Sequence, residues 1–154
     1  MTNKPTVVLF LDFDGVLHYF WPEPDATDEE NSYFYFIPAF ESVIRQFMTK
    51  LDITIIISSS WRDKRNYDQL RQPFSSDIRH LIKGVTPCHY DNSDGSRLKE
   101  CEEWLMTNNY NGAWFALDDH PDIWNSHGNL IFCQNGFKEN ETIALTEAFS
   151  KIIV

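Results

Sequence analysis

Two aspartates separated by one residue follow a short apolar run near the start of the chain. Residues 7–11 read Val-Val-Leu-Phe-Leu, and Asp12, Asp14 and Gly15 come soon after them in the order Asp-Phe-Asp-Gly. Alternate residues of an extended chain point to the same side, so both carboxylates should face one site, while Gly15 permits a tight turn. Two carboxylates this close repel each other, and proteins usually tolerate that repulsion only with a divalent cation or a shared proton. The spacing therefore predicts a metal site.

Two further groups of polar residues follow apolar runs. Residues 53–57 lead into hydroxyls and a guanidinium, which belong to Ser58, Ser59, Ser60 and Arg62. Residues 114–117 lead into Asp118 and Asp119. Hydroxyls and an arginine beside a metal are typical of a phosphoryl-binding site, and carboxylate oxygens are ligands that Mg²⁺ takes together with water and a substrate phosphate. We therefore expect Mg²⁺ as the cofactor.

Each group also has an ordinary structural explanation. A serine before a helix often caps its N-terminus, and Asp-Asp before His-Pro is typical of a turn. An Asp-x-Asp pair after a single strand occurs often by chance. Three such groups, each at the end of an apolar run, rarely occur together by chance. Their combination favours one shared site.

The elements that must position these groups alternate between strand and helix patterns. Short runs rich in β-branched and aromatic residues predict buried parallel strands at residues 7–11, 53–57, 114–117 and 130–133. Apolar residues at helical spacing predict helices at residues 38–50, 97–106 and 142–152. This order predicts an α/β fold, with a central parallel sheet flanked by helices, whose right-handed crossovers bring the carboxyl ends of the strands to one edge. Ligands bind at that edge.

Length and composition limit the classes of protein that fit. The chain has 154 residues, of which 42% are hydrophobic, and this predicts one globular domain over residues 1–154. The formal net charge of −10 excludes a surface-wide attraction to nucleic acids or anionic membranes. Any contact with a nucleic acid must therefore be local.

The cysteines and the N-terminus predict a cytoplasmic protein with no membrane partner. Cys88, Cys101 and Cys133 form no CxxC pair and leave one thiol unpaired in any disulfide scheme, which is typical of a reducing compartment. The apolar run at residues 7–11 is too short for a signal peptide, and a membrane span needs about 20 apolar residues.

Residues 19–37 fit neither the strand nor the helix pattern, being acidic in the middle and aromatic at both ends. They are either a loop or short hairpin that closes over a ligand, or a surface excursion held down by aromatic packing. The aromatic side chains themselves either stack on nucleobases or, as we favour, pack on the sheet. The histidines show no metal-ligand spacing, although His18 and His120 closely follow acidic groups.

The residues at the strand ends resemble the four motifs of the haloacid dehalogenase (HAD) superfamily. The matching stretches are LFLDFDGV, IIISSSWR, SRLKECEEWL and WFALDD. The finer pattern of DFDGVL, SSSWR, GVTP and LDD resembles the HAD domain group predicted to act in RNA repair, and more loosely the phosphatase domain of polynucleotide kinase-phosphatases. The resemblance implies a three-layer Rossmann-like fold. The gaps between the motifs leave no room for a large cap domain, which indicates an open site and a large substrate.

The resemblance also implies roles for the first two motifs. Asp12 is the nucleophile that takes up the phosphoryl group as an aspartyl-phosphate. Asp14 protonates the leaving oxygen, later activates water, and ligates Mg²⁺ through its backbone carbonyl. Ser58 or Ser59 hydrogen-bonds the phosphoryl oxygens, and Arg62 adds a forked contact to the same group.

The other two motifs supply a base and further acids. The resemblance implies that Arg97 or Lys99 neutralises the aspartyl-phosphate, and the spacing does not decide between them. Asp118 and Asp119 hold Mg²⁺ directly or through water, with Asp119 preferred as the direct ligand. Asp122 is a candidate for the usual third acid of the last motif.

These features together predict a Mg²⁺-dependent phosphomonoesterase that acts on a phosphorylated substrate, and the resemblance suggests an RNA or DNA end. Three alternatives stay open, namely a nucleotidase acting on small nucleotides, a phosphotransferase, and a non-catalytic module that binds a phosphorylated partner. Dehalogenation is disfavoured, because Asp14 two residues beyond the nucleophile suits phosphate esters rather than haloacids.

Overall fold

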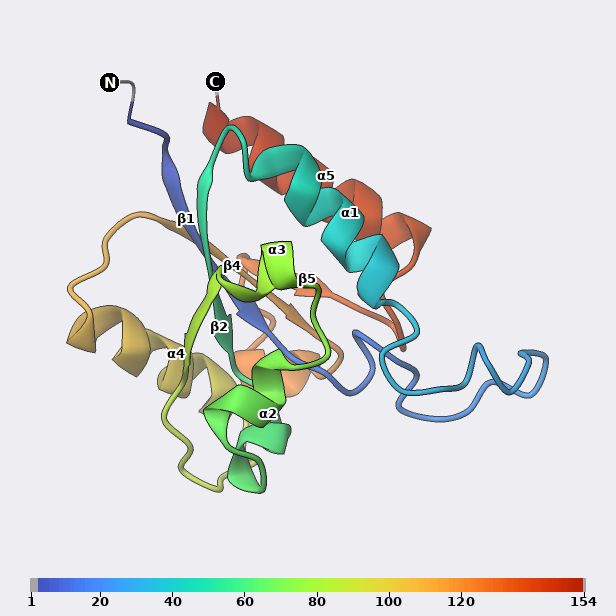
Figure 1. The fold of residues 1–154 in the computed structure, drawn as a ribbon. Coiled ribbons are helices and arrows are strands. Elements are labelled where there is room, and N and C mark those ends of the chain that lie inside the picture. Colours follow the sequence, from blue (N-terminus) through green and yellow to red (C-terminus); the bar gives the residue numbers. More distant parts are fainter. Residues whose placement is uncertain (1–2, 154) are drawn as a thin grey trace.

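The computed structural model describes residues 3–153, which form a five-stranded parallel sheet flanked by helices (Figure 1). The strands are β1 (Thr6–Leu11), β2 (Asp52–Ile57), β3 (Ile82–Val85), β4 (Ala113–Asp118) and β5 (Leu130–Phe132). They lie in the order β3-β2-β1-β4-β5, and every neighbouring pair is parallel. Because β1 lies between β2 and β4, the residues that follow these three strands meet at one edge of the sheet.

The longer helices cover the sheet on both faces. α1 (Ile37–Phe47) and α5 (Glu139–Ile153) pack against each other on one face, and α4 (Ser96–Thr107) lies on the other with a 3₁₀ turn at Pro121–Trp124 (Figure 1). All three helices predicted from apolar spacing exist, with ends shifted by at most three residues. The expected α/β fold with a Rossmann-like, three-layer arrangement is confirmed.

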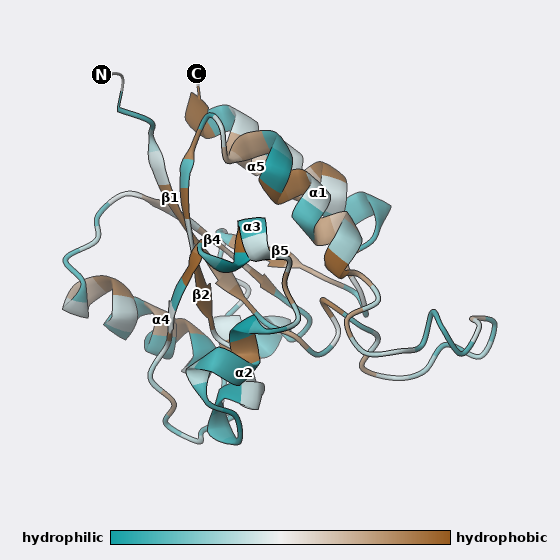
Figure 2. Ribbon diagram, viewed as in Figure 1, coloured by the Kyte–Doolittle hydropathy of each residue, from teal (hydrophilic) through white to brown (hydrophobic). Residues whose placement is uncertain are grey.

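Side chains of β1 alternate between two hydrophobic clusters. Val7, Leu9 and Leu11 pack with α1 and α5, whereas Val8 and Phe10 pack with α4, and none of the five is more than 2% exposed. Figure 2 shows these central strands as hydrophobic. Packing on both faces fixes the position of β1, and therefore also the position of the residues that follow its carboxyl end.

The segment between β2 and α4 contains elements that the sequence did not indicate, namely β3, α2 (Tyr67–Arg71) and α3 (Ser76–Arg79). The four predicted strands are confirmed as β1, β2, β4 and β5, and β3 is a fifth strand that was not predicted. β3 is a four-residue edge strand that includes Lys83 and Gly84, and its pairing with β2 contains a register shift. A strand this short and only partly buried carries too few apolar residues to be recognised.

Residues 19–36 leave the sheet as a long loop between β1 and α1 (Figure 1). No strand or helix forms within them, so the hairpin alternative was wrong. Asn135 fixes the base of this loop, because its side chain accepts a hydrogen bond from the backbone N–H of Phe20 and donates one to the carbonyl of Trp21. Within residues 3–153, no helix is long and apolar enough to cross a membrane.

Candidate active site

Three carboxylates meet where β1 and β4 end. Asp12 follows β1, Asp118 ends β4 and Asp119 follows it, and each side chain offers an oxygen within 4.8 Å of the other two. The backbone N–H of Asp12 donates to the carbonyl of Leu117 (3.1 Å), which continues the pairing of these strands beyond the end of β1. The parallel register of β1 and β4 thus brings together acids that are more than 100 residues apart in the sequence.

The negative charges of these three carboxylates repel one another. Burial, followed by the charge of Asp118, raises the pKa of Asp12 well above its ordinary range, and Arg97 only partly offsets this. Burial and the charge of Asp118 likewise raise the pKa of Asp119 to about 7. A compact set of oxygen donors with excess negative charge fits a hard divalent cation. Asp12, Asp118 and Asp119 therefore fit a Mg²⁺ site.

Asp118 is the most constrained of the three. Its Oδ2 accepts hydrogen bonds from Nη1 of Arg97 (3.3 Å) and Nε1 of Trp124 (2.9 Å), and its Oδ1 accepts one from the backbone N–H of His120 (3.1 Å). Its side chain is only 1% exposed, whereas that of Asp119 is more accessible. This difference favours Asp119 as the direct metal ligand and Asp118 as the residue that orients the site.

Arg97 rather than Lys99 faces the carboxylates. Its Nη1 lies 3.9 Å from Oδ1 of Asp12 and 3.3 Å from Oδ2 of Asp118, and its Nε lies 3.3 Å from Oε1 of Glu100. Burial works against the charge of Arg97, but the three acids outweigh it and raise the pKa of the guanidinium. Lys99 is exposed on α4. Of the two basic candidates, Arg97 is the one placed to neutralise charge on Asp12.

The guanidinium of Arg62 makes its hydrogen bonds to other groups of the protein. Its Nη1 donates to the backbone carbonyls of Ser58 and Ser59 (both 2.6 Å), and its Nη2 donates to Oε1 of Glu100 (2.7 Å). The side chain is 4% exposed. The forked phosphate contact expected of Arg62 does not agree with this geometry, because these bonds engage both terminal nitrogens. Arg62 instead holds the loop after β2, and Glu100 joins it to Arg97.

Ser58 is the serine whose hydroxyl lacks a partner. Its Oγ is buried and has no hydrogen-bond partner among the described residues, and the same is true of Oγ1 of Thr86, which follows β3. The hydroxyl of Ser59 accepts from the backbone N–H of Trp61 (3.2 Å) and caps a 3₁₀ turn at Ser60–Asp63. Unsatisfied buried hydroxyls are costly and need an explanation. A phosphoryl oxygen bound at Ser58 would supply one.

Asp14 lies on the turn after β1 and is held by two aromatic residues. Its Oδ1 accepts hydrogen bonds from Nε2 of His18 (2.7 Å) and Nε1 of Trp61 (3.0 Å). Nδ1 of His18 accepts from the backbone N–H of Phe34 (3.3 Å), which assigns the proton to Nε2. Partial burial opposes the charge of Asp14, but the bonds from His18 and Trp61, with a smaller effect of Arg65, outweigh it and lower the pKa. This carboxylate lies outside the three-acid cluster.

Gly15 makes this turn possible. Its φ of +74° lies in the left-handed region, and a Cβ at this position would collide with the carboxylate of Asp119. The tight turn expected at Gly15 is therefore confirmed, and the turn brings the backbone close to the carboxylate of Asp119.

Asp122 does not belong to the cluster. It is exposed on the turn after β4, and its backbone carbonyl accepts the N–H of Gly95 (2.9 Å), just before α4. This bond fixes the start of α4 relative to β4. His120 is also exposed.

The aromatic residues of the 19–36 loop divide into two sets. Tyr19, Phe34 and Phe36 pack against the main core, as the packing explanation predicts. A second set is 39% to 73% exposed and comprises Phe20, Trp21, Tyr33 and Tyr35. Packing therefore accounts for only part of this aromatic group.

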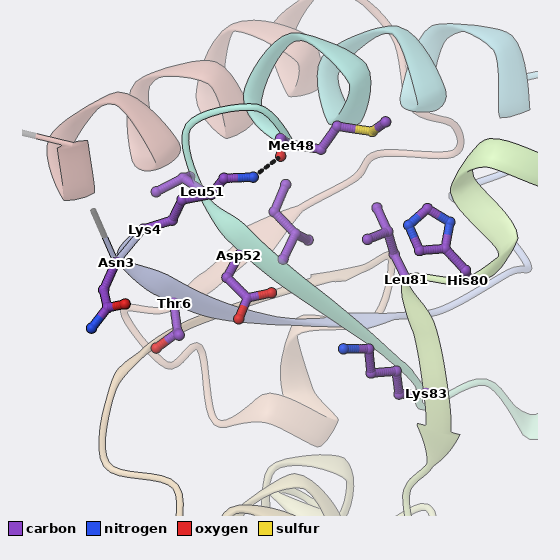
Figure 3. A pocket seen from close by; sticks show the side chains of 10 residues that line it. Asn3, Lys4, Thr6, Met48, Leu51, Asp52, His80, Leu81 and Lys83 are labelled. Carbon is purple, nitrogen blue, oxygen red and sulfur yellow. Dashed lines mark hydrogen bonds between the residues drawn. The ribbon is translucent and has the colours of Figure 1, made fainter. Parts of the chain in front are cut away.

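Two cavities lie at opposite ends of the sheet. One of about 570 Å³ lies where β1 and β2 begin, near Lys4, Asp52 and Lys83, and contains no residue of the four motifs (Figure 3). A smaller one of about 170 Å³ adjoins Arg97 and Glu100 at the edge that carries the acids. Because ligands of parallel sheets bind at the carboxyl ends of the strands, we place the chemistry at the smaller cavity and the neighbouring acids.

A Rossmann-like sheet whose central strand ends in Asp-x-Asp-Gly, with a second acid pair after the adjacent strand, defines a domain of the HAD type. Residues 8–142 match the family model of the HAD domain in Swiss Army Knife RNA repair proteins. The chain belongs to this family. No curated protein matches the chain.

Proposed function

We propose that this chain is a Mg²⁺-dependent phosphomonoesterase that works through an aspartyl-phosphate on Asp12. The observation that carries the proposal is the cluster of Asp12, Asp118 and Asp119, with Arg97 beside it. Three carboxylates and one guanidinium leave an excess of negative charge, which a bound divalent cation would balance.

Asp12, Asp119 and the backbone carbonyl of Asp14 would hold Mg²⁺, and Asp118 would support it. When bound, Mg²⁺ supplies positive charge that screens the phosphoryl oxygens from the aspartates. Arg97 adds a second positive charge next to Asp12, and the unpaired hydroxyl of Ser58 donates a hydrogen bond to a phosphoryl oxygen.

The reaction then has two steps. A carboxylate oxygen of Asp12 forms a bond to phosphorus while the bond from phosphorus to the leaving oxygen breaks, and Asp14 gives that oxygen its proton. In the second step Asp14 takes a proton from water, whose oxygen attacks phosphorus and releases Asp12. The hydrogen bonds from His18 and Trp61 both go to Oδ1, so they fix the Asp14 carboxyl and leave its Oδ2 to carry the proton in both transfers.

An RNA or DNA end is the substrate that we propose. The family model describes a domain of RNA repair proteins, and no helix or strand of the described residues forms a cap between β1 and α1. A site that grips only a terminal phosphate is compatible with the net charge of −10. We also propose the cytoplasm as the compartment, because the three cysteines are free thiols.

Hydrolysis of p-nitrophenyl phosphate, with and without Mg²⁺, tests the proposal. Removing the nucleophile in Asp12→Asn should lower turnover at least about 1,000-fold, while Asp122→Asn, an exposed acid outside the cluster, serves as the matched control. Native turnover in Asp12→Asn would exclude the covalent route. Absence of hydrolysis of this ester and of phosphorylated oligonucleotides would favour the non-catalytic phosphate-binding module.

A further inference from the structure

A surface of two aromatic rings and one cation lies directly beside Asp14, with its tyrosine and arginine exposed and its tryptophan partly buried. It consists of Tyr33, Trp61 and Arg65, which we call the aromatic ledge. The ring of Tyr33 stands edge-on to that of Trp61, with centroids 5.5 Å apart at 87°, and lies 5.0 Å from the ring of His18. The guanidinium of Arg65 lies 3.9 Å from the centre of the Trp61 ring. The ledge thus joins the loop between β1 and α1 to the 3₁₀ turn after β2.

Tyr33 is 73% exposed although it stands on a packed aromatic cluster. Its neighbour Phe34 turns inward and contacts both Phe13 and Trp61, so the loop is anchored immediately next to the exposed ring. Stacking on a fixed aromatic ring costs a ligand little ordering of the protein. Tyr33 therefore offers a preformed flat surface at the edge of the site.

The ledge lies on the leaving-group side of the site. Trp61 belongs to it and His18 lies against it, and both donate their hydrogen bonds to Oδ1 of Asp14. In the proposed reaction Asp14 protonates the leaving oxygen. Whatever is attached to that oxygen must pass close to Asp14, and Tyr33 and Arg65 lie against the two rings that bond Asp14.

We propose that the aromatic ledge binds the terminal nucleoside of a phosphorylated nucleic-acid end, with a base stacked on Tyr33 and the next backbone phosphate paired with Arg65. This inference rests on the proposed function and names the part of the substrate that the site selects. Base stacking on aromatic residues and phosphate contacts by arginine are the usual ways in which proteins bind single strands. Arg65 and its neighbour Lys64 supply this positive charge locally on a chain whose net charge is −10.

The test compares kcat/KM for 3′- and 5′-phosphorylated dinucleotides, of RNA and of DNA, with kcat/KM for acetyl phosphate, which has no ring. Tyr33→Ala should lower the ratio of dinucleotide to acetyl phosphate roughly 5- to 100-fold. Tyr33→Phe should retain the ratio, and Arg65→Ala should lower it in a salt-dependent way. Trp21→Ala is the matched control, because Trp21 is 71% exposed on the same loop but is not part of the ledge. The fastest of the four dinucleotides identifies the kind of end.

Two results would overturn the proposal that the aromatic ledge binds the terminal nucleoside. One is an unchanged ratio in Tyr33→Ala, and the other is a phosphoserine peptide that is hydrolysed as well as the dinucleotides. If the native protein hydrolyses none of these substrates, the proposed function fails. Calorimetry of the binding of the same dinucleotides in the presence of Mg²⁺ then tests the ledge separately. Weaker binding by Tyr33→Ala than by the native protein would support it, and equal binding or none would refute it.

Discussion

Raising the pH of the metal-free protein should lower its stability. The pKa of Asp119 is raised from 3.8 to about 7 by burial and by Asp118, and that of Asp12 is raised as well. Between the unfolded and the folded pKa, the folded chain binds more protons than the unfolded chain, so the free energy of unfolding falls as pH rises. Asp14 has the opposite shift, but its contribution is lost only as pH falls into the acid range, below this window.

The size of the effect follows from the shift at Asp119. One pKa unit is worth about 1.4 kcal/mol, and the linkage relation gives about 3 kcal/mol between about pH 5 and pH 8 for a fully buried group. Asp119 is partly exposed, so solvent screening reduces the expected loss to about 1–2 kcal/mol. For a chain of this size that corresponds to a fall in Tm of roughly 3–6 °C.

Thermal unfolding followed by circular dichroism in EDTA measures this effect. Asp119→Asn is the control, because it keeps the shape of the side chain but removes the titrating group, and it leaves every histidine in place. The Tm of this variant should depend less on pH. Adding Mg²⁺ at about ten times its Kd should restore about 1.4 kcal/mol above neutral pH. A Tm that is the same at both ends of the pH range, or that falls equally in Asp119→Asn, would refute the reasoning.

Five further substitutions separate the roles of neighbouring residues. Arg97→Lys should lower kcat/KM for p-nitrophenyl phosphate about 10- to 100-fold, because an ammonium cannot contact three acids as the guanidinium does, whereas Lys99→Ala should be native-like. Ser58→Ala should lower kcat/KM about 10-fold without lowering Tm, since its hydroxyl has no partner, whereas Ser59→Ala should cost about 1 kcal/mol of stability through its lost cap. Gly15→Ala should cost about 1–3 kcal/mol, measured by urea unfolding, because of its positive φ and the collision with an acid of the site.

Each of these expectations has a contrary result. Equal losses in the Arg97 and Lys99 variants would mean that α4 presents a different face to the acids. A lower Tm in the Ser58 variant would mean that the hydroxyl is paired within the protein. Native stability of the Gly15 variant would mean that the turn after β1 can relax away from Asp119.

The positions of the acids could be predicted because they depend on local patterns. The runs before Asp12 and Asp118 contain enough β-branched and aromatic residues to mark buried strands, and parallel strands place their carboxyl ends together. β3 could not be predicted in this way, since Lys83 and Gly84 interrupt its apolar character at the exposed edge of the sheet.

The choice between Arg97 and Lys99 depends on the rotation of α4. A usable signal was present, because Leu98, Cys101 and Leu105 share one face at helical spacing. Arg97 lies one helical turn before Cys101, whereas Lys99 lies one turn before Glu102 and Glu103. Lys99 therefore belongs on the opposite side of the helix from the sheet.

Other contacts depend on tertiary packing alone. Nothing in the sequence indicates that Trp61 and His18 donate to the same oxygen of Asp14. Nor can it show that Arg62 reaches backbone carbonyls and Glu100 rather than a phosphate, since a guanidinium suits all these partners equally. Such assignments need the distances between loops that follow different strands.

Identification of the phosphorylated residue tests the central claim most directly. In Asp14→Asn the second step should be slow, so that acetyl phosphate leaves the protein phosphorylated. Acid quenching, reduction with borohydride and peptide mass analysis would then convert the acyl phosphate to homoserine and locate it. The account predicts homoserine at position 12 and none in the Asp12→Asn, Asp14→Asn double variant. Homoserine at another position, or none in a protein that hydrolyses phosphate esters, would contradict it.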